Sequence, residues 1–97
     1  MNNQPNESQP NEIYLNHPTF GLLYRICLLK DNQELFTTLY AQRLFFTVTT
    51  DSNYFSFEPI SRTDARLLVE SLMRRLLLDR EVAKHRQLQA IYQRTFL

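Results

Sequence analysis

Residues 14–48 read YLNHPTFGLLYRICLLKDNQELFTTLYAQRLFFTV, a stretch in which aromatic and β-branched side chains are interrupted by short groups of turn-forming residues. Such groups stand at 16–18 and 30–34 and, further along the chain, at 51–53. Five short strands in so short a stretch favour a small, strongly bent antiparallel sheet, because closure or near closure protects the strand edges. The strands are predicted at residues 13–16, 19–29, 35–41, 43–49 and 54–58.

Gly21 is the single glycine of the chain and lies early in the long second predicted strand. A missing side chain there permits the bend or bulge that a small barrel requires, so this is where we expect the strand to bend. The alternative interpretation is that the glycine simply weakens the strand.

The hydrophobic period changes after Pro59 from that of a strand to that of a helix. Ser61 supplies a hydroxyl that can accept from the first-turn amides, and Asp64 follows three residues later, which is a variant of the capping box. A helix is therefore expected to begin here and to end near Leu78 and Asp79. Its apolar stripe is predicted to consist of Ala65, Leu68, Leu72 and Leu76, widened by Leu67, Val69 and Met73.

A second helix is predicted from about Arg80 to Thr95. Glu81 is expected in its first turn, where a negative charge suits the helix dipole. The apolar positions are Val82, Leu88, Ile91, Tyr92 and Phe96. Two adjacent amphipathic helices most simply fold back on each other as a hairpin.

The composition is that of a soluble globular protein, with 97 residues of which 43% are hydrophobic and 22% charged. We expect an α+β chain with a flexible tail over 1–11, a β domain over 12–60 and a helical hairpin over 61–97. No stretch approaches the roughly 18 to 20 apolar residues of a membrane helix, and the polar start lacks the features of a targeting segment. A cytoplasmic location is expected, and the single cysteine, Cys27, agrees with a reducing compartment.

No catalytic motif is recognisable in the sequence. His17 and His85 stand in different halves without a nucleophile or a metal-ligand pattern around them, and we interpret them as a turn residue and a helix-surface residue. A single glycine cannot make a glycine-rich phosphate loop, and carboxylates never occur as a close pair on one strand. We therefore expect no enzymatic activity, no metal site and no directly bound cofactor.

The third and fourth predicted strands are the best candidates for a recognition surface. If Ala41 and Gln42 form a tight reversal, side-chain alternation defines two faces. The expected core face carries Leu35, Thr37, Leu39, Leu44, Phe46 and Val48. The other face carries Phe36, Thr38, Tyr40, Arg43, Phe45 and Thr47. Tyr40 and Arg43 then lie side by side at the tip, and both residue types are enriched at interface hot spots. The alternative is that the helices cover this second face.

Four stretches of the sequence resemble the PII-interacting protein X (PipX) family of cyanobacteria: YLNHPTFGLLYR, DNQELFTTLYAQRLFF, FEPISRTDARLLVE and YQRTF. The resemblance covers nearly all of the chain after Glu12. It implies a five-stranded Tudor-like β-barrel followed by two helices, without enzymatic activity. The sequence departs from the family pattern in its longer Asn/Pro-rich start and around residues 73–87.

The resemblance also implies two partners that exclude each other. When 2-oxoglutarate is plentiful, such proteins bind and coactivate the dimeric nitrogen regulator NtcA; when it is scarce and ADP is favoured, the trimeric PII protein holds them. The barrel surface serves both complexes, and 2-oxoglutarate, ATP and ADP act through the partners. Further transcription regulators are left open as partners, and neither nucleic acid nor a membrane is expected.

The family's contact residues, carried over position by position, are Glu12, Tyr40, Gln42, Arg43, Leu44 and Phe46. Tyr40 and Arg43 agree with the choice made from the strand pattern. Leu44 and Phe46 do not, because alternation places both of them inward. A looser reversal would slip the register and turn them outward.

The charge of the chain is unevenly distributed and leaves a second function open. Residues 1–60 hold three basic and six acidic side chains, whereas residues 61–97 hold eight basic and four acidic ones. Small β-barrels with basic helices are also typical of RNA-binding modules, although the acidic bias of the barrel half argues against this. The simplest interpretation of the basic helices is a solvated surface. A third possibility is a purely structural adaptor, whose binding 2-oxoglutarate and ADP would not change.

Overall fold

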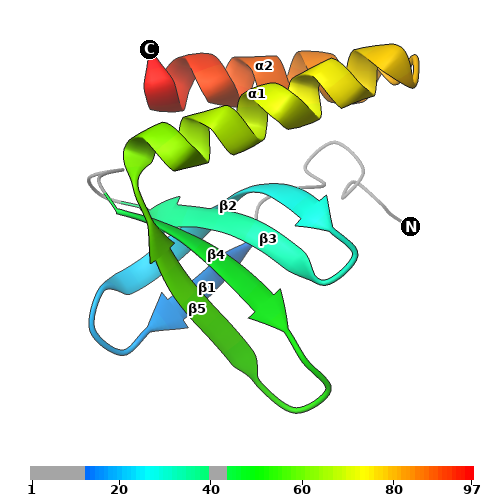
Figure 1. The fold of residues 1–97 in the computed structure, drawn as a ribbon. Coiled ribbons are helices and arrows are strands. Elements are labelled where there is room, and N and C mark those ends of the chain that lie inside the picture. Colours follow the sequence, from blue (N-terminus) through cyan, green and yellow to red (C-terminus); the bar gives the residue numbers. More distant parts are fainter. Residues whose placement is uncertain (1–12, 40–43) are drawn as a thin grey trace, which may run out of the picture.

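The computed structural model describes residues 13–39 and 44–97, so the predicted tail over 1–11 lies outside the described residues. Five strands are followed by two helices (Figure 1). The chain is α+β, as predicted. The strands are β1 (Tyr14–His17), β2 (Gly21–Lys30), β3 (Gln33–Thr38), β4 (Phe45–Thr50) and β5 (Phe55–Ile60), and the helices are α1 (Arg62–Leu78) and α2 (Val82–Phe96).

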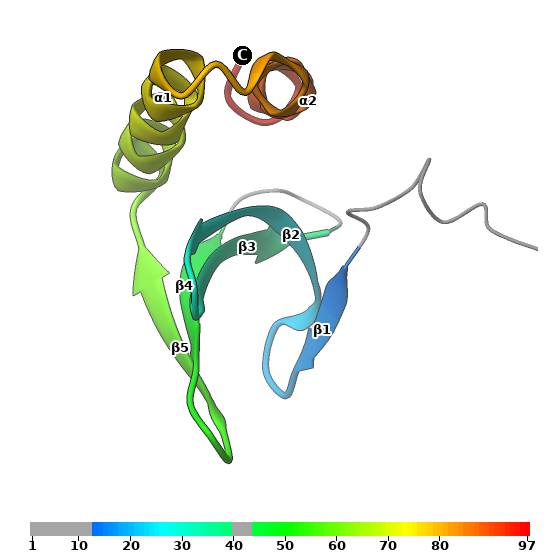
Figure 2. The ribbon, with the colours of Figure 1, turned by 90° about the vertical axis from the view of Figure 1, so that its right-hand side faces the viewer.

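The five strands form one antiparallel sheet in the order β1-β2-β3-β4-β5. Each strand pairs with the next one along the chain, and no pairing joins β1 to β5 within the described residues. The sheet therefore curls into a half-barrel, with its concave side open between the β1–β2 and β4–β5 hairpins (Figure 2). The sequence left open whether the sheet closes fully or nearly, and the observed sheet is nearly closed.

The bend of β2 lies further along the strand than Gly21. The register with β3 shifts between Arg25 and Cys27 and again between Leu28 and Lys30, so two bulges curve the second half of the strand. Gly21 instead opens β2 with a φ of +78°, a conformation that L side chains rarely adopt. A Cβ added there would meet nothing within 4 Å, so it is the backbone conformation and not lack of space that requires glycine.

The register between β3 and β4 differs by one residue from the prediction. Phe36 lies opposite Phe46 and Thr37 opposite Phe45, so Phe45 shares a face with Leu35 and Thr37. The predicted faces, which grouped Phe46 with Leu35 and Thr37, are therefore wrong. A two-residue reversal at Ala41 and Gln42 does not fit this pairing, because the observed register leaves an odd-numbered connection over residues 39–43.

Both faces of the sheet are buried. The face that meets the helices contributes Ile26, Leu35 and Phe45, which pack with residues of both helices; the ring of Phe45 stacks on that of Phe96 with centroids 5.4 Å apart. The concave face carries a second apolar cluster made of Leu23, Phe36, Phe46 and Val48. The alternative considered from sequence, that helices cover the second predicted face, holds for Phe45 but not for Phe36, which lies in the concave cluster.

Helix α1 begins where the capping pattern predicts. Ser61 is the N-cap, and its Oγ accepts a hydrogen bond from the Asp64 N–H at 3.0 Å. The buried stripe is narrower than predicted and turned toward Ala65 and Val69, which are fully buried. Leu72, Met73 and Leu76 are partly buried beside them, whereas Leu67 and Leu68 are exposed. The predicted stripe was wrong at these last two positions. At about 100° of rotation per residue, Leu67 lies opposite the buried stripe and Leu68 lies at its edge.

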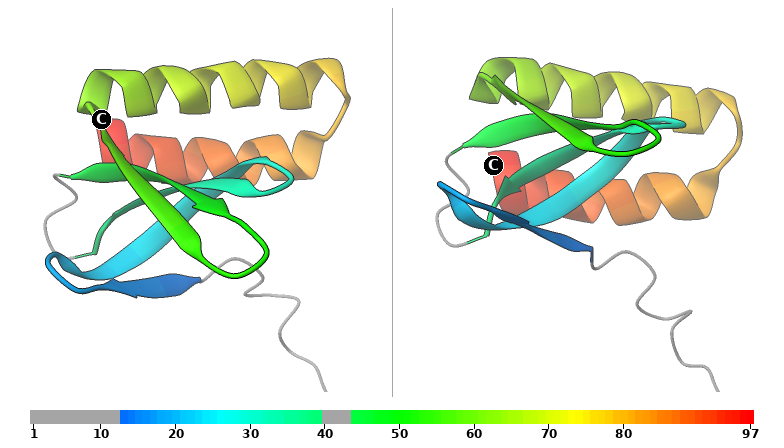
Figure 3. Two further views of the ribbon diagram at one scale, coloured as in Figure 1. Left: turned by 60° about the horizontal axis from the view of Figure 1, so that its bottom comes forward. Right: turned by 90° about the horizontal axis from the view of Figure 1, so that it is seen from below.

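Helix α2 starts at Val82, and Glu81 is its N-cap residue rather than part of its first turn. Val82 is exposed, contrary to the prediction, while Leu88 and Phe96 are buried as expected. The two helices run side by side as the predicted hairpin and cover one side of the sheet (Figure 3). The turn between them places Arg80 at φ +62°, with Glu81 N–H donating to the Leu76 carbonyl at 2.8 Å.

Polar contacts tie the two helices together along their length. The Tyr92 hydroxyl donates to the Glu70 carboxylate, and this hydrogen bond raises the pKa of the tyrosine. Near the end of the chain, Arg62 Nη2 donates to the Phe96 carbonyl at 3.1 Å, and its guanidinium lies 5.4 Å from the centre of the Phe96 ring. None of the described helices is long and apolar enough to cross a membrane.

Candidate partner-binding surface

The turn between β1 and β2 is held by the side chain of His17. Its Nδ1 accepts hydrogen bonds from the backbone N–H groups of Thr19 at 3.0 Å and Phe20 at 3.2 Å. A neutral imidazole that accepts at Nδ1 carries its proton on Nε2, so these two bonds select one tautomer. His17 therefore fixes the course of the turn, and with it the direction of the Phe20 side chain.

Four rings meet at this end of the sheet, and we call them the aromatic cluster: His17, Phe20, Phe46 and Phe57. The His17 ring lies 5.0 Å from Phe20, 5.7 Å from Phe46 and 5.1 Å from Phe57, between ring centres. Phe20 in turn lies 5.4 Å from Phe46. These separations are those of favourable aromatic pairs. Phe46 is only 2% exposed and forms the base of the cluster, whereas Phe20 is 44% exposed and forms its outer surface.

Hydrogen bonds anchor both ends of the connection between β3 and β4. The Leu44 carbonyl accepts from the Thr38 N–H at 3.2 Å and from Thr37 Oγ1 at 2.8 Å. On the other side, the Leu39 N–H donates to the Leu22 carbonyl at 3.0 Å. Leu22 is next to the β1–β2 turn, so this connection and that turn lie at the same end of the sheet. We call this region, with Phe20, Leu39 and Leu44 as its described members, the tip surface.

The residues predicted to contact partners fall into two groups. Glu12, Tyr40, Gln42 and Arg43 lie outside the described residues. Leu44 and Phe46 are described, and the structure separates them: Leu44 is 43% exposed, and Phe46 is buried.

The separation of Leu44 from Phe46 has a simple structural cause. Strand β4 begins only at Phe45, so Leu44 precedes the strand and is not bound by its alternation. The inward placement that alternation gave for Phe46 agrees with its burial, and the inward placement of Leu44 is wrong. Phe46 presents no surface of its own, but its ring supports His17 and Phe20.

Sequence reasoning missed the role of His17 and Phe20. His17 was expected to be an incidental turn residue, yet it both caps the turn and packs in the aromatic cluster. The signal that could have found it is the spacing in Asn16-His17-Pro18-Thr19-Phe20-Gly21, where a histidine stands four residues before a glycine that requires positive φ. An imidazole at the entrance of such a turn can accept from the amides inside it.

No group of three or more His, Cys, Asp or Glu side chains lies close enough to hold a metal ion in the described ranges 13–39 and 44–97. The thiol of Cys27 is not an activated nucleophile, because burial raises its pKa to about 12 and keeps it protonated. At the tip surface the exposed side chains of Phe20 and Leu44 are apolar, which suits contact with another macromolecule.

One comparison with known proteins identifies a family for the chain. A search of curated proteins finds no match. The family model described as PipX, PII-interacting protein X, matches residues 11–96, which is nearly the whole chain and includes every strand and helix. The resemblance noted in the sequence is thereby confirmed: the chain belongs to the PipX family of PII-interacting proteins.

Proposed function

We propose that this protein is a non-enzymatic adaptor of nitrogen and carbon signalling that binds PII and the transcription factor NtcA through its tip surface. The observation that carries the proposal is the family match over residues 11–96, because the family is defined by its interaction with PII. The geometry supports it, since Phe20 and Leu44 expose apolar side chains beside the connection that contains Tyr40, Gln42 and Arg43.

One surface with two partners is sufficient for a switch. The chain coactivates NtcA when 2-oxoglutarate is high and is sequestered by PII when it is low, because the small molecules change the affinities of the partners. A tenfold change in one partner's affinity shifts the competition by about 1.4 kcal/mol. No small-molecule site on this chain is required for that response, and the exchange takes place in the cytoplasm.

The contact residues are proposed to act in two ways. Glu12, Tyr40, Gln42, Arg43 and Leu44 contact the partners directly. Phe46 contributes from below, by holding Phe20 and His17 in place, since its ring lies 5.4 Å from Phe20 and 5.7 Å from His17. Loss of Phe46 would then weaken binding by loosening a surface, and not by removing a contact.

The test is co-elution of this chain with purified PII and with purified NtcA, with 2-oxoglutarate and with ADP in separate runs. We expect a complex with NtcA in 2-oxoglutarate and a complex with PII in ADP. The variants Tyr40→Ala and Arg43→Ala should weaken both complexes while circular dichroism stays unchanged. Binding that ignores both small molecules, or variants that bind both partners as well as the wild type, would refute the proposal.

A further inference from the structure

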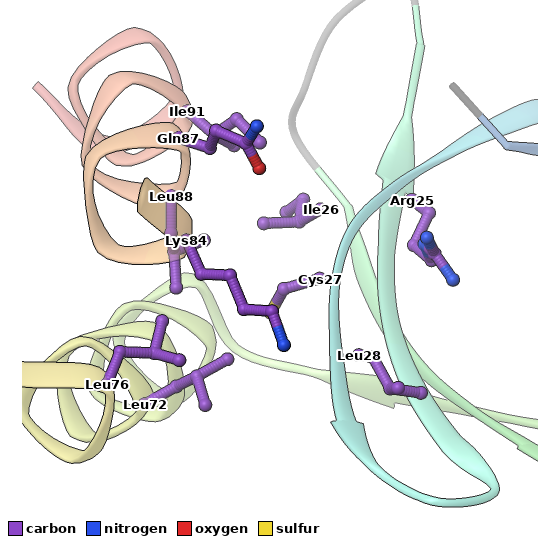
Figure 4. A pocket seen from close by; sticks show the side chains of 10 residues that line it. All are labelled: Arg25, Ile26, Cys27, Leu28, Leu72, Leu76, Lys84, Gln87, Leu88 and Ile91. Carbon is purple, nitrogen blue, oxygen red and sulfur yellow. The ribbon is translucent and has the colours of Figure 1, made fainter. Parts of the chain in front are cut away.

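A groove lies between the second half of β2 and the two helices, away from the tip surface (Figure 4). Its volume of about 450 Å³ is within the range of roughly 300–1,000 Å³ that is typical of small-molecule sites. Walls come from three elements, with β2 on one side and α1 and α2 on the other. The lining residues are Arg25, Ile26, Cys27, Leu28, Leu72, Leu76, Lys84, Gln87, Leu88 and Ile91.

Most of the lining is apolar. Ile26 and Leu88 are buried core residues, and Leu72, Leu76 and Ile91 are partly buried around them. Cys27 behaves as one more apolar wall, because burial raises its thiol pKa to about 12 and keeps it uncharged. The bulge of β2 between Arg25 and Cys27 allows two consecutive side chains, Ile26 and Cys27, to pack on the helix side of the strand.

The charged side chains that line the groove, Arg25 and Lys84, are both basic. Figure 4 shows Lys84 reaching from α2 across the space beside Cys27, whereas the amide of Gln87 lies at the other end of the groove, beside Ile91. No acidic side chain is among the lining residues. Arg25 points away from the helices in Figure 4, and its guanidinium pairs with Glu34 at 2.6 Å. Lys84 makes only a loose contact of 3.9 Å with Glu81, so its ammonium group can take an anion.

We propose that this groove binds a free medium-chain carboxylate, with the alkyl chain among Ile26, Leu72 and Leu88 and the carboxylate at Lys84. An apolar groove with an amine at one end matches one unbranched chain and one anionic head. A protein partner fits less well, because a stable protein interface needs about 800 Å² of surface on each side. This site lies apart from the tip surface, and the proposal does not depend on the proposed adaptor function.

The direct test is a titration of the ¹⁵N-labelled full chain with decanoate, decanol and decylamine, followed by NMR. Decanoate should bind saturably, shift the amides of β2 and α2 around the groove, and bind more tightly than decylamine. Octanoate should bind about fifteenfold more weakly, because it lacks two methylenes and each buried methylene is worth about fourfold in affinity. Lys84→Met should weaken decanoate about fivefold and leave decanol unchanged. The matched control is Lys30→Met, which changes the one other lysine, an exposed residue outside the groove.

Chemical modification of Cys27 supplies a second, independent measurement, since the chain has one cysteine. Decanoate should slow the reaction of this thiol with a small methanethiosulfonate reagent at pH 9 at least fivefold, and Cys27→Ser should abolish the signal. Equal affinity for decanoate and decylamine, shifts confined to the tip surface, or an unchanged modification rate at saturating decanoate would each overturn the proposal. None of these outcomes bears on binding to PII or NtcA.

Discussion

Leu44 and Phe46 lie two residues apart, and replacing each of them in turn distinguishes a surface contact from a core contact. Phe46 is 2% exposed and packs against Leu23, Phe36 and Val48. Truncation of a buried Phe to Ala costs about 3–5 kcal/mol, a large part of the roughly 5–15 kcal/mol that stabilises a domain of this size. Phe46→Leu removes less volume, and we expect it to lower the free energy of unfolding by about 1–2 kcal/mol, or about 5–10 °C in Tm.

Leu44→Ala is the matched substitution outside the core. Leu44 is 43% exposed, and only its backbone is anchored, through its carbonyl to Thr37 and Thr38. Its effect on the free energy of unfolding should stay within about 0.5 kcal/mol. Its affinity for PII should nevertheless fall, because the lost side chain belongs to the proposed contact. Urea denaturation followed by circular dichroism, with PII titrations of the same samples, measures both quantities. The reasoning is refuted if Phe46→Leu leaves stability unchanged, or if Leu44→Ala costs more than Phe46→Leu.

Three further predictions concern His17, Arg80 and Cys27. His17→Ala leaves the two turn amides of Thr19 and Phe20 without their acceptor, so the free energy of unfolding in urea should fall by about 1–2 kcal/mol, and His17→Asn should recover part of the loss. Arg80→Gly should raise the free energy of unfolding by about 0.5–1 kcal/mol, because φ of +62° is costly for any residue but glycine, and a destabilised variant would contradict this. Burial raises the pKa of Cys27 from 9.0 to about 12 in the folded state, so the unfolded thiol ionises first. The free energy of unfolding should therefore fall as the pH rises from about 9 to 12. Cys27→Ala should show a shallower fall over that range, and parallel curves for the two proteins would count against the burial of the thiol.

The elements of this fold could be predicted from sequence where the signal is local. The turn formers at 16–18 and 51–53 mark real boundaries, and the cap formed by Ser61 and Asp64 begins α1 where expected. Register could not be predicted in the same way. It depends on the length of the connection over 39–43, and a one-residue difference exchanges the two faces of a strand. That difference moved Phe45 onto the helix side of the sheet.

The limits of the site prediction have the same origin. Leu44 lies one residue before β4, so its exposure depends on where pairing stops and not on its own type. His17 could not be found from motif searches. Its role rests on two backbone amides and one ring of its own turn, and on two rings from the distant strands β4 and β5. The stripe of α1 was overestimated at Leu67 and Leu68, since periodicity counts apolar residues and cannot tell how wide a surface the sheet offers them.

The central claim is that PII and NtcA take the same surface of this chain in turn. Native mass spectrometry of all three proteins, with this chain limiting, tests it most directly. The account predicts particles in which each copy of the chain is bound to PII or to NtcA, with the balance moving toward NtcA as 2-oxoglutarate is added. A particle that holds PII, NtcA and a single copy of this chain would contradict it.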